Sequence, residues 1–409
     1  PQRWPADPRC AGRPAHRNSS VTLATNVSDW ERRATALAAE LTDAGILIDP
    51  CWRAAIEQTP RHLFVPRFYR DDDTIVDGGD PATVGEWLNT VYNNTSLVVQ
   101  CAIAPGTDLQ FPTSSSTMPS LMVCMLQLLD VIDGSNVLEI GTATGYNAAL
   151  LCHRLGADQV ASIELHPGLA ADAADHLHYL GYEPTLAVGD GAGGIPDRAP
   201  YDRIIATCAV PAIPPVWIDQ LAPGGRIVTD LRGELASSLA VLDKIAPDTV
   251  QGQLLDLHGH FMWLRSTPDG PLPNVDRFNL VINLDDAETT GTDLDPRMLD
   301  EPGLRVLLSI VEPNLGPITH TQRETHDMWW LRADNCWAEI TTGANTTVTY
   351  GGPRNIWKTI ERIAAEWQRI GRPGRGRYGL TARADGTHHY WLDQPDRLLF
   401  ADITYTSGL

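Results

Sequence analysis

Short apolar runs alternate with longer amphipathic segments through the middle of the chain. From residue 136 onward, each run is followed by a glycine-containing loop or by a segment with helical spacing of its apolar positions. Strands that alternate with helices form a parallel sheet that is covered on both faces, so we expect an α/β domain here. The predicted strands are Val137–Ile140, Val160–Glu164, Leu186–Val188, Arg203–Ala206 and Gly225–Asp230, and the predicted helices include 147–155 and 167–180.

The segment before this domain predicts helices. Apolar residues recur at helical spacing after residue 28, and Gly45 is a typical helix stop. Asp49 followed by Pro50 fits the N-cap and first turn of a second helix over residues 51–59.

Two further segments connect these helices to the sheet. Residues 70–112 are rich in Asp, Gly, Asn and Thr, which predicts loops with short strands. Residues 120–129 are almost entirely apolar and predict a buried helix. This run is too short to cross a bilayer, which needs ~20 apolar residues.

The pattern changes near residue 245, where the alternation of strands and helices stops. Seven of the twelve Trp residues follow this point, so we expect a separate α+β accessory domain with its own core. Residues 285–301 carry seven acids and one Arg and predict a loop or linker. Predicted strands cover 328–331, 336–340 and 346–350. An apolar stripe marks a helix from Pro353 to Gly371, and a hairpin joins 378–383 to 389–392.

These patterns divide the chain into an extended or disordered segment 1–27, a domain 28–245 and an accessory domain 246–409. The first twenty residues have no apolar core and do not read as a signal peptide. The seven cysteines are odd in number, far apart and without a CxxC pair, which fits a reduced cytoplasm.

The chain of 409 residues has a formal net charge of −20. Such a balance argues against a general nucleic-acid binder and against an anionic membrane surface, since both need clustered cations. Residues 354–383 are the exception, with eight Lys or Arg and two Glu. One interpretation is a solvated helix end; the sharper one is a dock for an acidic peptide through Arg372, Arg375 and Arg377.

A glycine loop follows the first predicted strand. Gly141 and Gly145 frame it, but Ala143 stands where a dinucleotide motif needs its middle glycine. Glu164 ends the second strand 23 residues after Gly141, close to the ~20 expected for an acid that binds ribose hydroxyls, and Asp190 follows the third strand. One acid for ribose, one for adenine and no phosphate cradle fit S-adenosylmethionine better than NAD.

Several motifs, in this order, resemble the protein-L-isoaspartate O-methyltransferase family. They are Pro60–Pro66, Thr117–Pro119, Val137–Asn147, Glu164, Gly189–Gly191 and Pro223–Arg226, and the resemblance covers roughly residues 28–240. It implies a Rossmann-like S-adenosylmethionine-dependent methyltransferase. The family usually has glycine where this chain has Ala143. Loop and resemblance together predict these cofactor contacts: Glu139, Gly141, Thr142, Gly145, Tyr146, Asn147, Glu164, Asp190 and Gly191.

The resemblance also implies the chemistry, which is methyl transfer to a peptide carboxylate. In the family, a Ser two residues before a Pro orients that carboxylate; alignment on Pro119 places Thr117 there. We therefore predict Thr117 and Ser116 as catalytic residues and Ser115 as a substrate contact. The alternative is that these hydroxyls cap the helix that begins at Pro119.

The chain departs from the family's repair enzymes, because it carries about 165 residues beyond the methyltransferase domain, enough for another domain. This extension, and the segment from Trp367 to Leu380, resemble actinobacterial members associated with lanthipeptides and graspetides. There, similar proteins methylate an Asp of a ribosomal precursor peptide, giving isoaspartate or aspartimide. The alternatives are general repair of isoaspartyl proteins and a non-catalytic peptide-binding scaffold. We predict no metal site, because His258 and His260 have no further ligand at suitable spacing.

Overall fold

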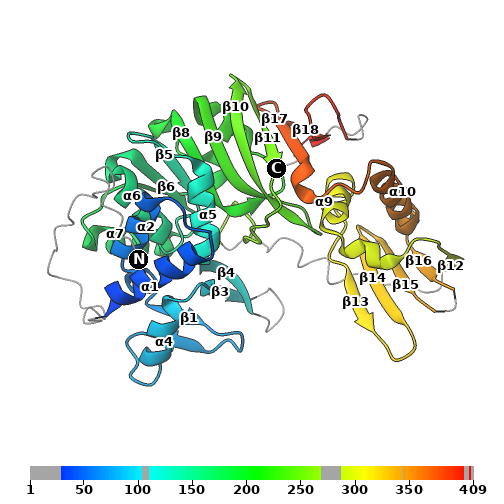
Figure 1. Cartoon of the computed structure of the whole chain (residues 1–409), viewed down its shortest axis with the longest axis horizontal. Coiled ribbons are helices and arrows are strands. Elements are labelled where there is room, and N and C mark those ends of the chain that lie inside the picture. The colour runs from blue at the N-terminus through cyan, green and yellow to red at the C-terminus, as the bar shows by residue number, and fades with distance from the viewer. Residues whose placement is uncertain (1–28, 104–109, 269–286, 344, 400–404, 407–409) are drawn as a thin grey trace.

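The computed structural model describes residues 29–103, 110–268, 287–343, 345–399 and 405–406. A central sheet contains β5 (Val137–Ile140), β6 (Val160–Glu164), β7 (Thr185–Val188), β8 (Tyr201–Val210), β9 (Leu221–Arg232), β10 (Ser237–Ala246), β11 (Thr249–Leu254), β17 (Tyr378–Arg383), β18 (Thr387–Leu392) and β19 (Tyr405–Thr406). The order of these ten strands is β19-β18-β17-β11-β10-β9-β8-β5-β6-β7 (Figure 1).

The half of this sheet formed by β5 to β9 is parallel, as the sequence predicted. β5 pairs in parallel with both β6 and β8, β6 pairs with β7, and β8 pairs with β9. Every residue of β5 and β6 is buried, as expected for strands covered on both faces. The α/β fold class is therefore confirmed.

Helices cover both faces of this parallel half. One face, which includes Val137, Ile205 and Val228, packs against α1 (Trp30–Asp43), α2 (Pro50–Gln58), α5 (Pro119–Leu129) and α6 (Tyr146–Leu155). Leu177 of α7 (Pro167–Tyr179) belongs to the same cluster. The opposite face, which includes Leu138, Ile204 and Ile227, packs against Trp217 of α8 (Pro215–Gln220) and continues into the C-terminal half.

The predicted helix boundaries agree with the structure in this region. The carboxylate of Asp49 accepts a hydrogen bond from the backbone N–H of Cys51, which makes it the N-cap of α2. Gly45 follows α1 with a φ of +72°, in the left-handed region that favours glycine.

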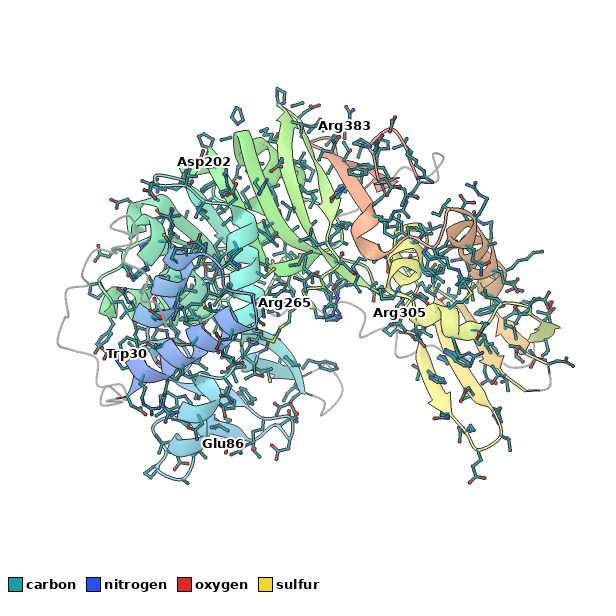
Figure 2. The ribbon with its side chains drawn as sticks, viewed as in Figure 1. Trp30, Glu86, Asp202, Arg265, Arg305 and Arg383 are labelled. Carbon is teal, nitrogen blue, oxygen red and sulfur yellow. The ribbon has the colours of Figure 1, made fainter. Side chains whose placement is uncertain are left out.

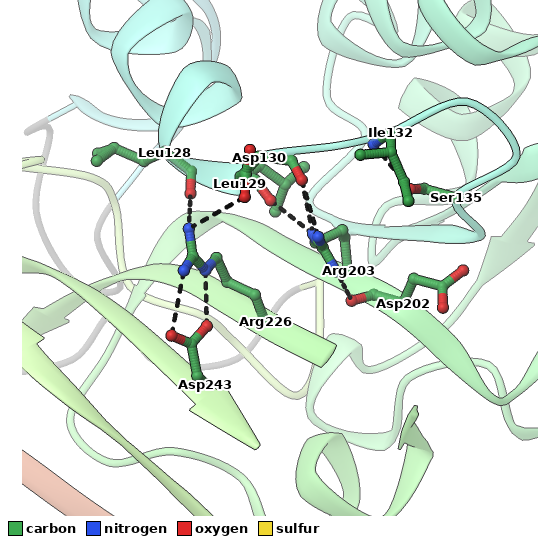
Figure 3. A network of polar contacts seen from close by, with 9 residues as sticks. All are labelled: Leu128, Leu129, Asp130, Ile132, Ser135, Asp202, Arg203, Arg226 and Asp243. Atoms are coloured by element: carbon green, nitrogen blue, oxygen red, sulfur yellow. Dashed lines mark hydrogen bonds and ion pairs between the residues drawn. The ribbon is translucent and has the colours of Figure 1, made fainter. Parts of the chain in front are cut away.

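Two arginines satisfy the carbonyl groups at the C-terminal end of α5 (Figure 3). Arg203 donates to the carbonyl oxygen of Leu129 at 2.7 Å, and Arg226 donates to that of Leu128 at 3.1 Å. Arg226 also forms a bidentate ion pair with Asp243 at 2.7 and 3.1 Å. The last carbonyls of a helix have no partner within it, so these arginines fix α5 against β8 and β9.

A small antiparallel sheet lies beside the N-terminal helices. It contains β1 (Arg67–Tyr69), β2 (Ile75–Asp77), β3 (Leu97–Ile103) and β4 (Gln110–Ser116) in the order β2-β1-β3-β4, with α3 (Arg61–Phe64) and α4 (Val84–Val91) against it. The sequence predicted only loops and short strands for residues 70–112. The helix α4 and the seven-residue strands β3 and β4 correct this prediction.

Arg61 joins the elements of this small sheet. Its side chain is fully buried, and its guanidinium donates to the carbonyl oxygens of Val91, Asn93, Thr95 and Thr117 and to Ser116 Oγ, at 2.9 to 3.3 Å. Burial lowers the pKa of Arg61 to about 10. A buried guanidinium with this many acceptors holds the connections between α4, β3 and α5 at fixed positions.

A second sheet and two helices make up most of the C-terminal half. The strands β12 (Glu288–Gly291), β13 (Thr319–Gln322), β14 (Asp327–Ala333), β15 (Cys336–Thr341) and β16 (Thr347–Gly351) lie in the order β12-β16-β15-β14-β13. The predictions of β14, β15, β16 and α10 (Ile356–Arg369) are confirmed, and the predicted stripe of α10 is buried at Ile356, Ile360, Ile363 and Trp367. The sequence patterns did not predict α9 (Pro302–Val311), and they indicated a loop where β12 lies.

The central sheet crosses the predicted domain boundary at residues 245 and 246. That boundary falls at the end of β10, yet β10 pairs with β11, and β11 pairs with β17 of the predicted hairpin. Residues 249–254 and 378–392 therefore complete the first sheet, and the chain returns to it after building the second one (Figure 1).

The structure also bears on membrane-spanning helices and on the state of the cysteines. Within the part of the chain that the structure describes, no helix is long and apolar enough to cross a membrane. Cys124, Cys152 and Cys208 are free thiols, but Cys51 is disulfide-bonded, which the cysteine spacing did not predict.

Candidate functional site

The strand order reverses between β5 and β8, and a cavity opens at the carboxyl ends of these two strands. Such switch points are where ligands bind in open α/β sheets. The lining comes from β4, from the ends of β5, β6 and β8, and from a segment after β11. It comprises Thr113, Ser114, Ser115, Ile140, Gly141, Ala143, Ile163, Glu164, Leu165, Gly191, Thr207, Cys208 and residues 261–265.

The glycine loop needs its glycines for close packing. Gly141 has a φ of +93°, and a Cβ atom there would lie 3.0 Å from Thr207 Oγ1, which donates to the Gly141 carbonyl oxygen at 2.8 Å. Gly145 has a φ of +86°, and its Cβ would lie 3.0 Å from that of Ala173. These contacts hold the loop between β8 and α7, with its backbone open to the cavity.

Glu164 connects the end of β6 to this loop. Its carboxylate accepts hydrogen bonds from the backbone N–H groups of Ala143 at 2.8 Å and His166 at 3.0 Å. The side chain lines the cavity and is largely buried. A carboxylate has about four acceptor positions, so lone pairs remain for hydroxyl groups of a ligand.

Asp190 and Gly191 follow β7 at the same edge of the sheet. The carboxylate of Asp190 is exposed and accepts from the backbone N–H of Ala192 at 2.9 Å. Gly191 lines the cavity, and a Cβ there would lie 2.5 Å from the Ile140 side chain. Glycine is therefore required where the adenine side of the cavity is expected.

Glu139 lies beneath the loop and does not line this cavity. It is completely buried, and its carboxylate accepts from Asn147 Nδ2 at 2.7 Å and from Ser162 Oγ at 2.5 Å. Burial raises the pKa of Glu139 to about 7. The Ser162 hydroxyl also bonds that of Thr142 at 2.6 Å, so the network joins β5, β6 and α6.

The nine predicted cofactor residues thus fall into two groups. Gly141, Glu164 and Gly191 line the cavity, with Asp190 beside it. The other five, which support the loop from below or behind, are Glu139, Thr142, Gly145, Tyr146 and Asn147.

The hydroxyl-rich tract is a strand and not a helix cap. Ser114 and Ser115 line the cavity together with Thr113, whereas Ser116 Oγ and the Thr117 carbonyl oxygen accept hydrogen bonds from Arg61. The N-cap of α5 is Met118, without a side-chain hydrogen bond. The structure therefore places Ser115 in the cavity lining and Ser116 and Thr117 beyond it, and a substrate contact of Ser115 stays a prediction.

The segment 261–265 forms one side of the cavity, and no sequence pattern predicted it there. Its backbone is anchored on β8, because the N–H of Ala209 donates to the Met262 carbonyl and the N–H of Leu264 donates to the Ala209 carbonyl, both at 2.8 Å. Arg265 donates to the carbonyl oxygen of Thr113 at 3.3 Å, and Figure 2 shows it between the small sheet and the central sheet.

Asp230 and Arg232 hold this segment in place. The buried Asp230 carboxylate accepts from the backbone N–H groups of Gly259 and Phe261 at 3.2 and 3.1 Å. Arg232 donates to the Phe261 carbonyl oxygen at 2.5 Å and lies over the ring of Trp263 at 5.1 Å. The apolar run Phe261–Leu264 was the only local pattern in this segment, and it gave no indication of contact with the glycine loop.

The three arginines predicted to contact substrate do not line this cavity, and two of them have hydrogen-bond partners within the chain. Arg377 pairs with Asp393 at 2.7 and 2.6 Å, and Arg375 donates to the Ser237 carbonyl oxygen at 3.3 Å. The Arg372 guanidinium lies 5.9 Å from the Trp367 ring centre. Peptide docking by these residues stays a prediction.

The described residues fit S-adenosylmethionine. Gly141 and Gly191 line the cavity without a side chain, and Glu164 presents a carboxylate at the strand end where folds of this type place an acid for ribose hydroxyls. When bound, this cofactor supplies an electrophilic methyl group on a sulfonium, and the acidic edge of the sheet suits its positive charge.

Comparison with known proteins agrees with this geometry. The family model of protein-L-isoaspartate(D-aspartate) O-methyltransferase matches residues 32–258. Protein-L-isoaspartate O-methyltransferase 2 of Archaeoglobus fulgidus is 35% identical over 192 residues, which cover 46% of this chain and 74% of that protein. Protein-L-isoaspartate O-methyltransferase 1 of Syntrophobacter fumaroxidans is 37% identical over 216 residues, or 51% of this chain and 86% of that protein.

A solved protein-L-isoaspartate O-methyltransferase aligns over 88% of this chain and 100% of its own, with a TM-score of 0.50 and 21% identity. The shared fold therefore extends past the residues that the family model matches. Since that model covers more than half of the chain, the protein belongs to the protein-L-isoaspartate O-methyltransferase family and is an S-adenosylmethionine-dependent protein carboxyl O-methyltransferase.

Proposed function

We propose that the enzyme methylates the side-chain carboxylate of an aspartyl-type residue in a precursor peptide bound between β4 and the segment 261–265. The observation that carries the proposal is the composition of the cavity. Gly141, Glu164, Ser114, Ser115 and Arg265 all line it. The first two are the cofactor side of this proposal, and the other three are its substrate side. Hydroxyls and a guanidinium are suitable donors to a carboxylate.

The reaction needs position more than proton transfer. A carboxylate with a pKa near ~4 is already ionised at neutral pH, so no general base is required. Its oxygen attacks the methyl carbon as the carbon–sulfur bond breaks, which yields a methyl ester and a neutral thioether. The walls formed by β4 and residues 261–265 hold that oxygen in line and exclude water.

The ester then favours ring closure. The backbone nitrogen of the following residue attacks the ester carbonyl and loses its proton, and methanol leaves with that proton. The resulting succinimide either persists as an aspartimide or takes up water to give aspartate or isoaspartate.

The C-terminal half supports the choice of a precursor peptide as substrate. Residues 249–254 and 378–392 extend the central sheet, and the second sheet follows beyond β18 (Figure 1). A larger surface next to the cavity allows many residues of one peptide to be bound, which a repair enzyme acting on many unrelated proteins does not need.

General repair is the second candidate, and the family match over residues 32–258 favours it. Incubation with S-adenosylmethionine separates the two, using a short isoaspartyl peptide and the Asp-containing peptides encoded next to this gene. The precursor proposal expects added methyl mass or lost water on one aspartyl peptide. Methylation of the isoaspartyl peptide alone would establish repair. A non-catalytic scaffold is not retained, because the chain belongs to a family of methyltransferases.

Arg265 gives a direct test of the substrate side. Arg265→Lys removes the planar fork but keeps the charge, so we expect KM for peptide to rise about tenfold with little change in cofactor affinity. Arg323→Lys, on the exposed turn after β13, is the matched control. Equal losses of peptide and cofactor affinity in Arg265→Lys would contradict this role.

A further inference from the structure

A second cavity lies on the other side of Trp263, at the junction of the central sheet with α9. Its volume is about 180 Å³, and a cavity of roughly 150 Å³ holds a benzene molecule. We call it the junction cavity. Its lining comprises Pro211, Leu231, Arg232, Gly233, Glu234, Ala236, Ser237, Ser238, Leu254, Trp263, Val306, Ser309, Ile310, Pro313, Asn314 and Tyr390.

The junction cavity is next to the cavity at the carboxyl ends of β5 and β8. Trp263 lines both, and Arg232, which lines the junction cavity, lies over the Trp263 ring. The Phe261 N–H donates to Asp230 and the Phe261 carbonyl oxygen accepts from Arg232, and these two bonds fix the backbone just before this indole. A peptide bound in the first cavity can therefore place a neighbouring side chain in the junction cavity, because residues one or two positions apart in an extended peptide lie close together.

The walls of the junction cavity are mainly apolar and come from both halves of the chain. Leu231 and Leu254 belong to the central sheet, whereas Val306 and Ile310 lie on α9. α9 approaches closely here, because a Cβ added at Gly233 would lie 2.9 Å from that of Ser309. An apolar pocket of this size favours a large side chain over a backbone segment.

Two polar atoms in the lining are unsatisfied. Among the residues that the structure describes, the buried hydroxyls of Ser237 and Ser309 have no hydrogen-bond partner. A buried hydroxyl without a partner costs free energy, which a polar atom on the occupant would recover. An aromatic side chain with a polar tip, as in Tyr or Trp, matches the apolar walls and can bond one of these hydroxyls.

We propose that the junction cavity binds a tyrosine or tryptophan side chain of the peptide substrate, within two residues of the residue that is methylated. The inference rests on the proposed function and adds a specificity site to it. The site combines β9, β10, α9 and Trp263, so it exists only where the C-terminal half packs against the methyltransferase sheet.

Two sets of isoaspartyl and aspartyl peptides test the proposal with the full-length enzyme. In each set, one of the four positions nearest the reacting residue carries Tyr, Trp, Phe, Leu or Gly, and methyl transfer is measured as kcat/KM. We expect Tyr or Trp at one position to raise kcat/KM about tenfold or more over Gly. Equal values at all four positions would overturn the specificity site and leave the proposed function intact.

Variants then locate the effect. Val306→Phe fills the cavity and should remove the preference for Tyr while leaving the Gly peptide within about twofold of wild type. Ser309→Ala should reduce the preference for Tyr over Phe. Val84→Phe, on the exposed face of α4, is the matched control, and Ala236→Met fills the cavity from the sheet side if Val306→Phe does not fold.

The remaining outcomes are also decisive. A preference that survives both filling variants would place aromatic recognition elsewhere and overturn the proposal. Equal loss for every peptide would show that the cavity holds part of this chain or only supports the fold. Absence of methylation on every peptide by the wild-type enzyme would instead contradict the proposed function, and the specificity site with it.

Discussion

The residues predicted from the glycine loop differ in whether they line the cavity or support the loop from within the core. Gly141, Glu164 and Gly191 line the cavity, and their contact with the cofactor stays a prediction. Glu139 was expected near the cationic cofactor, but its carboxylate lies in a buried network with Asn147 and Ser162. A motif records which residues the loop requires; whether a side chain faces the ligand or the core depends on packing that the motif does not contain.

Ala143 adopts a conformation that suits glycine. Its φ is +46°, in the left-handed region, which costs a residue with a Cβ roughly 1–2 kcal/mol. Ala143→Gly removes that cost and increases the entropy of the unfolded chain, so we expect a net gain of up to about 1 kcal/mol in the free energy of unfolding. Urea denaturation measures it, and Ala148→Gly inside α6 is the control that should lose about 1 kcal/mol. A loss of similar size in both variants would contradict a left-handed conformation at Ala143.

Glu139 predicts a pH dependence of stability. Its pKa is about 7 when folded and 4.5 in the reference state, so between these values the folded protein binds more protons than the unfolded one. Stability from this group is present below pH 4.5 and falls as the pH rises to 7, by up to roughly 3 kcal/mol.

Glu139→Gln keeps a polar side chain in the network and should abolish this decline. His62 acts in the opposite direction, since burial lowers its pKa to about 4, so the wild-type and variant curves must be compared by difference. The free energy of unfolding measured from pH 4.5 to 7.5 gives that difference, with the exposed Glu183→Gln as control. Parallel curves for wild type and Glu139→Gln would refute a buried, mostly protonated Glu139.

At the scale of elements, periodic segments were predicted and segments held by distant partners were not. The parallel strands, α1, α2, α5 and α10 follow from apolar spacing and caps. β4 has the sequence Gln-Phe-Pro-Thr-Ser-Ser-Ser, without an apolar alternation, and its extended form depends on pairing with β3. α9 follows an acidic stretch that resembles a linker, although six of its ten residues are buried.

Dependence on distant partners also explains why part of the candidate site could not be predicted from the sequence. The segment 261–265 lies more than a hundred residues from the glycine loop and meets it through backbone bonds to β8. Ser114 and Ser115 reach the cavity because Arg61 holds the end of β4 from behind. Contacts of this kind depend on tertiary packing and leave no local signature.

A substitution at Arg61 tests whether this side chain holds the elements of the small sheet together. Arg61→Lys leaves several of its carbonyl acceptors unpaired, so we expect a loss of about 2–4 kcal/mol in the free energy of unfolding. Faster proteolysis between residues 92 and 117 should accompany it, together with slower methyl transfer. Arg67→Lys, exposed on β1, is the control. Normal stability with unchanged proteolysis would show that the five hydrogen bonds do not hold the small sheet.

At the scale of the whole molecule, the two halves share one sheet and one core. The basic segment 354–383 belongs to this unit, because some of its cations pair within the chain, as Arg354 does with Glu312 and Arg377 with Asp393. The hydrophobic cluster on one face of the central sheet runs from Leu138 through Leu307 of α9 to Leu392 of β18. The second sheet therefore completes the methyltransferase core.

This continuity predicts that the enzyme unfolds as a unit. Leu380 in β17 and Leu331 in β14 are both fully buried in that cluster but lie in different sheets. Each Leu→Ala substitution removes about 2–5 kcal/mol, so each should lower the Tm of one common transition by several degrees. Calorimetry with far-UV circular dichroism measures this, and coincident curves are expected for wild type and both variants. Two separate transitions, with Leu331→Ala moving only one of them, would show instead that the halves are independent domains joined by a hairpin.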